Sequence, residues 1–535
     1  MTSKSLLYNA RIYTVAGPLV VDSMALRDDR VEAIGHSLHL EGEFRSYSRV
    51  NLNHKTVVPG FVDAHTHFFF FALSLGRVNL HELESLDACV KRIQKFARGL
   101  ATGEWVVGEG YTPNRFRRIE PDRYLLDDVT GGRPAFVFSK DQHSAWVNSL
   151  ALKMAGISPA TPDPKGGRIE RFADGIPSGI LREAPAYQKV LNCIPDPPEK
   201  EINRRWALAL EHAHKKGVTG VHSFDGPRGF TFMSGLAEKN RLGLRINYYA
   251  PARLLSTLRE TGAGYGAGTD YFRLAGVKIF ADGSLGSQTA LCFNRYLGSK
   301  DNYGIEVTTV PEMRRLARSA SRLGLPCAIH AIGDKAVANV LDALEGAPSL
   351  SARARHRIEH LQLVRRKDLL RLKRLGVVAS AQPSHCPSDI GLVRSYWGAR
   401  GADAYIFRTI IDKHIPMAFG SDAPIEPLDP IAGIAAAVRR AQPGSRDVFR
   451  PEQRITASEA LFRFTVGPAI ACGQEHCRGR LLPGYPADFV VLSEDITKVP
   501  PTRIYDVRVL ATVLAGHVKY CHSSISRAGL LQTCQ

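Results

Sequence analysis

The chain has 535 residues, 44% hydrophobic and 23% charged, a composition typical of folded globular proteins. Its formal net charge is +18, but the lysines and arginines are scattered along the chain. The sequence contains no zinc finger, aromatic RNA-binding motif or recognition-helix pattern, so we do not expect nucleic acid as a partner. No run approaches 18 apolar residues, so we expect no membrane span.

The cysteine content and the N-terminal residues indicate the cellular compartment in which the protein is expected. The nine cysteines are dispersed and include no Cys-x-x-Cys pair, which argues against a disulfide framework. The chain begins without the basic region and apolar core of a signal peptide. We therefore expect a cytoplasmic protein.

Short strand-like segments with tight turns occur at both ends of the chain. They are Leu6–Val15, Leu19–Leu26, Arg30–Ile34, Ala487–Leu492, Ile504–Leu514 and His517–Tyr520. Their similar character predicts one small β-sandwich domain built from both termini, residues 1–58 and 475–525.

Between these ends, residues 59–474, apolar strand-like runs alternate with helical patterns. The runs are Val57–Asp63, Gly217–Phe224, Leu244–Ala250, Phe272–Phe280, Pro326–His330, His356–Leu361, Val377–Gln382 and Pro416–Gly420. Strand–helix units in this number predict an α/β fold, a closed (β/α)8 TIM-like barrel of parallel strands.

The gap of about 150 residues after the first run is too long for one crossover helix. We interpret residues 70–212 as an inserted subdomain at the mouth of the active site, with a helix near Asp87–Arg98 and a strand at Ala135–Phe138. Its aromatic residues hint at an apolar or aromatic substrate, although aromatic side chains more often belong to a core. They are Trp105, Tyr111, Phe116 and Trp146.

The first run ends in Asp63, His65 and His67. Side chains two apart on a strand face the same way, and buried imidazoles and a carboxylate are costly without a partner. A divalent metal is the expected partner, and satisfied core histidines are the alternative. His212 and His214 have the same spacing in a helical pattern, where residues two apart diverge, so we interpret them as a solvated helix face.

Other predicted strands end in similar chemistry, and the carboxyl ends of barrel strands meet at one mouth. A single strand-end histidine is more often structural, and Asp422 alone could cap a helix. We interpret His222 as structural. The remaining strand-end residues are Lys278, His330, His360, Gln382, His385 and Asp422.

These motifs together resemble the amidohydrolase superfamily, and most closely its amidohydrolase-3 branch, which includes N-substituted formamide deformylases. The matching segments are Pro59–His67, Lys278 with Asp282–Ser284, His330–Asp334, Arg357–His360, Gly420–Pro424, His143–Asn148, Gly179–Glu183, Gly479–Leu481 and Gly484–Phe489. The resemblance covers nearly the whole chain.

The resemblance implies one or two divalent ions, with zinc as the expected metal. His65 and His67 would hold the more buried ion with Asp422, and His330 and His360 would hold the second. Lys278 would bridge the ions as N6-carboxylysine. A buried ammonium beside cations is disfavoured, and the neutral amine can react with carbon dioxide. An ion pair between Lys278 and Asp282 is the alternative.

The expected reaction is hydrolysis of a C–N bond in a small molecule, of a non-peptide amide or formamide-like kind. Metal lowers the pKa of bound water from about 15.7 to about 7. Asp422 would take the water's proton and deliver it to the leaving nitrogen. His143 would stabilise the oxyanion or orient the substrate, with a structural loop histidine as the alternative.

Asp63, Arg182, Asp282 and His385 are expected to contact substrate or to support the ligands. Two other functions remain open. One is a mononuclear deaminase on the same scaffold, and the other is a non-catalytic binding or regulatory protein that kept the fold. The substrate, the number of ions and the oligomeric state, including a homodimer, are not decided by the sequence.

Overall fold

The computed structural model describes residues 4–17, 19–81, 83–101, 103–112, 121–348, 350–351 and 353–524. The chain forms two compact units. The barrel unit comprises Met1–Phe70, Leu208–Ala281 and Thr308–Gln535, and the insertion unit comprises Phe71–Ala207 and Asp282–Val307. Phe116 lies outside the described residues.

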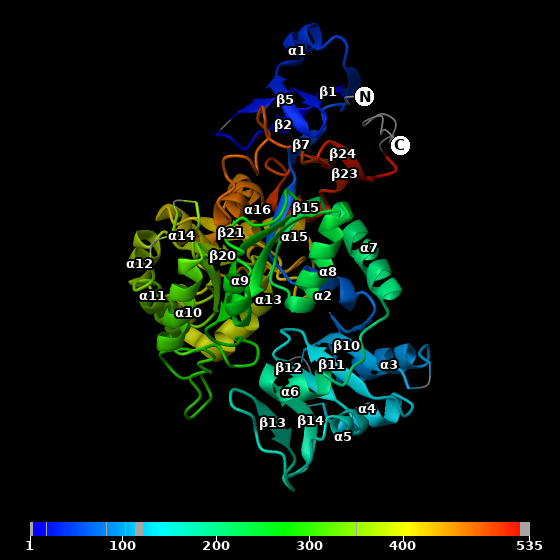
Figure 1. Ribbon diagram of the computed structural model, residues 1–535, viewed down its shortest axis with the longest axis vertical. Helices are drawn as coiled ribbons and strands as arrows, with labels where there is room; N and C mark the ends of the chain where they lie inside the picture. The colour runs from blue at the N-terminus through cyan, green and yellow to red at the C-terminus, as the bar shows by residue number, and fades with distance from the viewer. Residues whose placement is uncertain are drawn as a thin grey trace. The chain divides into compact units, whose positions relative to one another are not determined.

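A parallel sheet of eight strands, counted over the described ranges, forms the centre of the barrel unit (Figure 1). In spatial order the strands are β8 (Phe61–Thr66), β15 (Val218–Ser223), β16 (Arg245–Pro251), β17 (Phe272–Phe280), β18 (Cys327–Ala331), β19 (Arg357–His360), β20 (Val378–Ala381) and β21 (Met417–Phe419). A parallel bridge between Thr66 and Ala423 brings the two edge strands together. Each expected run contributes a strand, and the predicted α/β barrel is confirmed.

Helices follow most of these strands. They are α8 (Pro227–Glu238), α9 (Leu255–Glu260), α10 (Val310–Arg322), α11 (Asp334–Leu344), α12 (Asp368–Arg374), α13 (His385–Leu392), α14 (Phe407–Asp412), α15 (Pro430–Arg439) and α16 (Ala457–Ala471). In α10, Met313, Ala317 and Ala320 are buried while Arg315 and Arg318 are exposed. Burial at this helical spacing packs one stripe of the helix against the barrel unit.

The expected first strand is in fact two strands that meet at Gly60. The first, β7 (Thr56–Pro59), pairs with strands of the terminal domain, and β8 begins the barrel. Gly60 donates its N–H to the Asp488 carbonyl at 2.9 Å. A Cβ at Gly60 would lie 2.3 Å from Thr219 Oγ1, so only glycine fits between the strands. The prediction of one continuous strand was wrong because two sheets share this apolar run.

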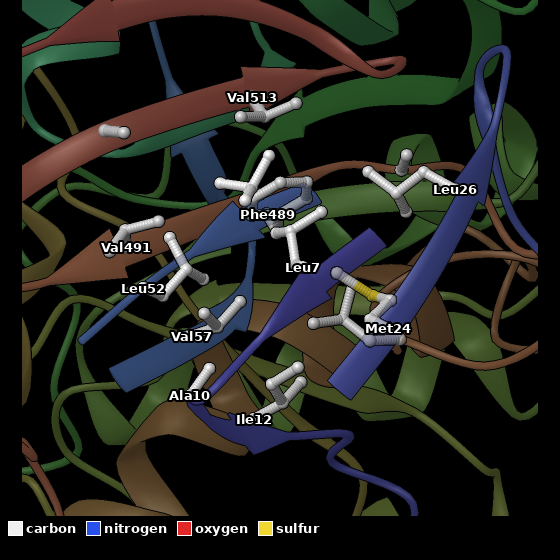
Figure 2. Close-up of a cluster of buried hydrophobic side chains, with 14 of the residues drawn as sticks. Leu7, Ala10, Ile12, Met24, Leu26, Leu52, Val57, Phe489, Val491 and Val513 are labelled. Atoms are coloured by element: carbon white, nitrogen blue, oxygen red, sulfur yellow. The ribbon is translucent and has the colours of Figure 1, made fainter. Parts of the chain in front are cut away.

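Both termini build one β-sandwich. Its sheets have the orders β5-β4-β1-β6 and β24-β23-β22-β7-β2-β3. The strands are β1 (Lys4–Tyr8), β2 (Arg11–Tyr13), β3 (Val20–Val21), β4 (Ser23–Arg27), β5 (Arg30–Gly35), β6 (Ser48–Asn51), β22 (Phe489–Leu492), β23 (Val509–Leu514) and β24 (His517–Cys521), with α1 (Ser37–Glu43) beside them. Figure 2 shows Leu7 and Met24 in the same buried cluster as Phe489 and Val513. The shared core explains why the two ends have the same sequence character.

The insertion unit contains its own sheet, in the order β13-β14-β12-β11-β10-β9. Its elements are α2 (Phe68–Ser74, shared with the barrel unit), β9 (Val78–Asn79), α3 (Leu86–Ala97), β10 (Val106–Tyr111), α4 (Arg123–Val129), β11 (Ala135–Ser139), β12 (Ser144–Val147), α5 (Ser149–Met154), β13 (Arg168–Arg171), β14 (Pro177–Arg182) and α6 (Ala184–Leu191). Tyr111 and Trp146 are fully buried, with ring centroids 5.8 Å apart. Trp105 is also buried. These aromatic side chains therefore belong to the interior and carry no argument about substrate.

His212 and His214 lie on α7 (Glu199–Lys215), as expected, but His214 is buried with its Nε2 3.0 Å from the Gly243 carbonyl oxygen. The solvated-face interpretation is therefore wrong for His214. The eight cysteines that the structure describes form no disulfide with one another. In the same described ranges, no helix has the length and apolar character needed to span a membrane.

Candidate metal centre

The carboxylate of Asp422 lies among histidine rings at the carboxyl ends of the barrel strands. Its oxygens are 3.4 Å from His65 Nε2, 3.6 Å from His67 Nε2, 3.8 Å from His385 Nε2 and 4.0 Å from His360 Nδ1. These side chains come from the ends of β8 and β19, the start of α13 and the segment after β21. The residues that sequence reasoning placed at separate strand ends thus meet at one place.

The spacing of these atoms suits a shared ion. One ligand atom from each of His65, His360 and Asp422 lies within 4.8 Å of the other two. Two ligands that are each about 2.1 Å from a tetrahedral zinc ion lie about 3.4 Å apart. The distances between Asp422 and the imidazoles of His65 and His67 are close to this value.

His330 and Lys278 complete the predicted set. The His330 ring centroid is 4.5 Å from that of His360. Lys278 Nζ lies 4.6 Å from the centroid of the Phe224 ring and 4.9 Å from that of Phe280. Both side chains are almost completely buried in the barrel unit.

The backbone is strained at two of these positions. His360 has φ +71° and Asp422 has φ +64°, in the left-handed region that residues other than glycine seldom occupy. In a regular strand, Glu359 and His360 would face opposite sides. β19 ends at His360, where φ is positive. The His360 ring lies next to His330, and its centroid is 4.9 Å from that of the His65 ring. Strain of this kind is found preferentially at functional sites.

Burial keeps the imidazoles neutral. Burial lowers the pKa of His65 and that of His360 well below the usual value. Positive charge nearby acts in the same direction, chiefly that of Lys278 on His65 and that of His330 on His360. Burial lowers the pKa of His67 to about 3. It lowers the pKa of Lys278 to about 8, against the attraction of nearby carboxylates. Neutral imidazole is the form that binds metal.

The tautomer of His65 is set by a carboxylate. His65 Nδ1 lies 2.5 Å from Glu359 Oε2, and the carboxylate can only accept, so Nδ1 carries the hydrogen. Nε2 then presents its lone pair on the side of Asp422, and in the described part of the chain this buried atom has no hydrogen-bond partner. A buried acceptor that faces a carboxylate, with no proton between the two atoms, is the arrangement expected around a bound cation.

Sequence reasoning missed the group that holds Glu359. Arg357, fully buried, binds both oxygens of Glu359. It also donates to the Ala64 carbonyl at 2.6 Å, to Ser380 Oγ at 2.7 Å and to His222 Nδ1 at 2.7 Å. The sequence does place an arginine and a glutamate two residues apart on an apolar strand. Such charges are seldom fully buried unless they are paired, so this pattern could have indicated the buried ion pair.

Asp63 and Gln382 support the site without joining the ligand group. Asp63 accepts the N–H of His65 at 3.0 Å and that of Ser421 at 2.9 Å, which joins the end of β8 to the segment after β21. Burial raises the pKa of Asp63 to about 7, although these hydrogen bonds oppose the shift. Gln382 Oε1 lies 2.8 Å from His360 Nδ1.

Three further predicted residues lie in the insertion unit. His143 Nδ1 is 2.9 Å from Glu183 Oε2. Burial alone would lower the pKa of His143, but Glu183 and the charges of Asp141 and Asp282 outweigh it and raise that pKa to about 9. His143 is therefore a cation at neutral pH. Arg182 pairs with Glu170, and Asp282 Oδ2 accepts the Leu291 N–H at 2.8 Å.

A parallel barrel with histidines and an aspartate gathered at its strand ends defines the class of metal-dependent hydrolases. The chain belongs to the amidohydrolase family, whose members are hydrolases that act on carbon–nitrogen bonds, because the family profile matches residues 49–520. Protein LONG AFTER FAR-RED 3 of Arabidopsis thaliana is 32% identical over 96% of this chain and 91% of its own length.

Two other relatives agree with this assignment. The N-substituted formamide deformylase of Arthrobacter pascens is 28% identical over 96% of this chain and 98% of its own. The crystal structure of an uncharacterized metal-dependent hydrolase from Pyrococcus furiosus has a TM-score of 0.73 and 30% identity, covering 93% of this chain and all of that chain.

Proposed function

We propose that the protein hydrolyses a non-peptide C–N bond, of an amide or an N-substituted formamide, with a divalent ion held at the strand ends of the barrel. The observation that carries the proposal is His65 Nε2, a buried acceptor without a hydrogen-bond partner among the described residues, 3.4 Å from the Asp422 carboxylate. The formamide deformylase relative supports the class of bond.

The donor set fits zinc, which prefers imidazole and carboxylate ligands in a tetrahedral arrangement. His65, His67 and Asp422 would hold one ion. His330 and His360 would hold a second, with Lys278 as a carbamate between them. Its pKa of about 8 leaves an appreciable fraction of neutral amine near neutral pH, which is the form that reacts with carbon dioxide.

A bound divalent ion would supply Lewis-acid activation of water and of the substrate carbonyl. Asp422 takes the proton from the attacking water and passes it to the leaving nitrogen. Glu359 holds His65 in the tautomer that leaves Nε2 available. His143, cationic at neutral pH, is suited to bind the developing oxyanion or an anionic group of the substrate.

The test is a screen of zinc-loaded protein against N-formyl amines, acylated amino acids and cyclic amides, with the released amine measured. Asp422→Asn should reduce turnover by at least about 10²-fold, in the range expected for loss of a general base. Asp412→Asn, which changes a largely exposed aspartate of α14, is the matched control and should retain activity. Full turnover by Asp422→Asn would contradict the assignment of the base.

Two rival functions give different results in the same screen. A mononuclear deaminase would release ammonia from an amino-substituted heterocycle and would contain one ion per chain. A regulatory protein that kept the fold would show no turnover with any substrate, and Asp422→Asn would change nothing. The retention of every expected ligand residue supports the enzyme.

A further inference from the structure

A second polar cavity lies in the barrel unit, at the end of the barrel opposite the metal ligands. Residues at the starts of β16 and β17 and before β8 line it, and the end of α16 closes it. Its volume for the centres of water-sized spheres is about 50 Å³. A single water needs roughly 10–15 Å³ on this measure, so the space suits a few waters or one small polyatomic ion.

The wall of this cavity carries more positive than negative charge. Its charged lining residues are Arg245, Arg273, Arg478, Arg480, Asp270 and Asp488. Arg245 binds Asp488 through two hydrogen bonds, and Arg478 lies 2.8 Å from Asp270. Arg273 instead donates to the Cys472 carbonyl at 3.0 Å and lies 4.6 Å over the Tyr265 ring.

Three buried polar atoms of the lining have no hydrogen-bond partner within the described ranges. They are His222 Nε2, Asn247 Oδ1 and Arg478 Nη1. Because Arg357 donates to His222 Nδ1, His222 Nε2 carries the hydrogen and is a donor. Asn247 Oδ1 is an acceptor in the structure, and rotation of the amide by 180° would present its NH₂ group in place of the oxygen. The buried donors His222 Nε2 and Arg478 Nη1 would rarely be left unsatisfied in a folded protein, so these two atoms indicate a missing acceptor.

We propose that this cavity is a second ligand site, which binds one small oxyanion. The excess of arginine, the unsatisfied donors and the small volume all favour a compact anion with several acceptor oxygens over a cation or an apolar ligand. A carboxylate or a larger phosphate ester would leave donors unmatched or exceed the space. The site goes beyond the proposed reaction and does not depend on it.

The cavity is connected to the metal centre by a continuous chain of hydrogen bonds. His222 contacts Arg357, Arg357 binds Glu359, and Glu359 holds His65. An anion that accepts the His222 hydrogen would draw that ring toward the cavity and change how Arg357 shares its donors with Glu359. Occupancy of the cavity therefore alters the affinity of the protein for zinc at the other end of the barrel.

Location is tested first, with crystals of the zinc-loaded protein soaked in selenate and anomalous scattering used to find selenium. Calorimetry with sulfate at constant ionic strength measures the affinity in solution. We expect a selenium peak among Arg273, Asn247 and His222, and saturable binding at one sulfate per chain. Selenium found only beside the metal, an adventitious ion only on the surface, or no saturable binding would overturn the site.

Variants separate this site from the metal centre. Arg273→Gln and Asn247→Leu should each weaken sulfate binding at least tenfold, while Arg446→Gln, at an exposed position, should not. Asp422→Asn should still bind one sulfate per chain, and its affinity should change by no more than the factor by which sulfate changes zinc affinity, since the metal centre is not the sulfate site. If Arg273→Gln does not fold, Asn247→Leu alone decides. Equal binding by wild type and both cavity variants would refute the proposal.

The connection is tested by zinc affinity, measured by competition with a chelator in the presence and absence of sulfate. We expect at least a threefold change in the wild type and none in Asn247→Leu. Sulfate binding without any change in zinc affinity would retain the site and overturn the connection. Neither measurement requires turnover, so failure of the proposed reaction would be seen separately.

Discussion

Replacing Arg357 with methionine should destabilise the barrel unit strongly. The guanidinium is fully buried and binds Glu359, which is also fully buried. Methionine has a similar length and no charge, so Arg357→Met leaves the Glu359 carboxylate in the interior with the His65 ring as its remaining hydrogen-bond partner among the described residues. Breaking one side of a buried ion pair costs about 3–5 kcal/mol, much more than an exposed pair contributes.

The loss extends beyond the ion pair. Arg357 also supplies donors to the Ala64 carbonyl and to Ser380 Oγ, and each acceptor left unsatisfied adds about 1–3 kcal/mol unless water replaces the donor. We therefore expect a decrease of about 4 kcal/mol or more in the free energy of unfolding. The affinity for zinc should fall about 10–100-fold, because Glu359 no longer holds His65 in a fixed orientation.

A double-mutant cycle isolates the pair. Urea unfolding of wild type, Arg357→Met, Glu359→Gln and the double variant gives the coupling energy between the two side chains. The double variant has no unpaired charge, so its destabilisation should be at least about 1.5 kcal/mol less than the sum of the two single variants. Values that add within about 0.5 kcal/mol would refute the reasoning, as would a loss below about 1 kcal/mol in Arg357→Met.

Three further predictions address other parts of the chain. The pKa of His143 is raised to about 9, from about 6.5 in the unfolded chain, so its contribution to stability is complete below about pH 6.5 and disappears toward pH 9. The melting temperatures of wild type and His143→Gln should therefore converge as the pH rises through this window. A difference that stays constant with pH would contradict the argument. Native mass spectrometry with bicarbonate present should show one added carboxyl group in wild type and none in Lys278→Gln; an unmodified wild type would remove the carbamate. Gly60→Ala should lower the free energy of unfolding by about 1–3 kcal/mol because its Cβ meets Thr219. Gly235→Ala, with open space around it in α8, is the control and should leave the free energy of unfolding unchanged or raise it by up to about 1 kcal/mol. Equal effects of the two substitutions on the midpoint of urea unfolding would contradict the packing argument.

The barrel and its mouth could be predicted because both follow from short-range rules. Each strand-like run is long and apolar enough to be recognised alone, and the carboxyl ends of parallel barrel strands must face one way. His65, His330, His360 and Asp422 are therefore brought together by topology, whatever the details of the helices between them.

Other features depend on contacts that a local pattern does not contain. The run from Val57 to Val62 carries no polar side chain, and the close approach of Thr219 shows why it divides at Gly60. The segment Asp282–Val307 belongs to the insertion unit although it follows a barrel strand, and nothing in its periodicity marks the change. The orientation of His65 depends on Glu359, which is 294 residues away in the sequence.

The polar interior of this barrel has a consistent physical explanation. The inside of a parallel barrel is usually filled by layers of branched apolar side chains, and a buried ion pair such as Arg357–Glu359 adds little net stability over them. Its contribution is positional, because Glu359 fixes the tautomer of His65 and Arg357 holds both oxygens of Glu359 in place. The same guanidinium contacts His222 beside the second cavity. A side chain that is unfavourable for the core thus connects two polar sites, and replacing it with an apolar residue should separate them even in a variant whose stability is restored elsewhere.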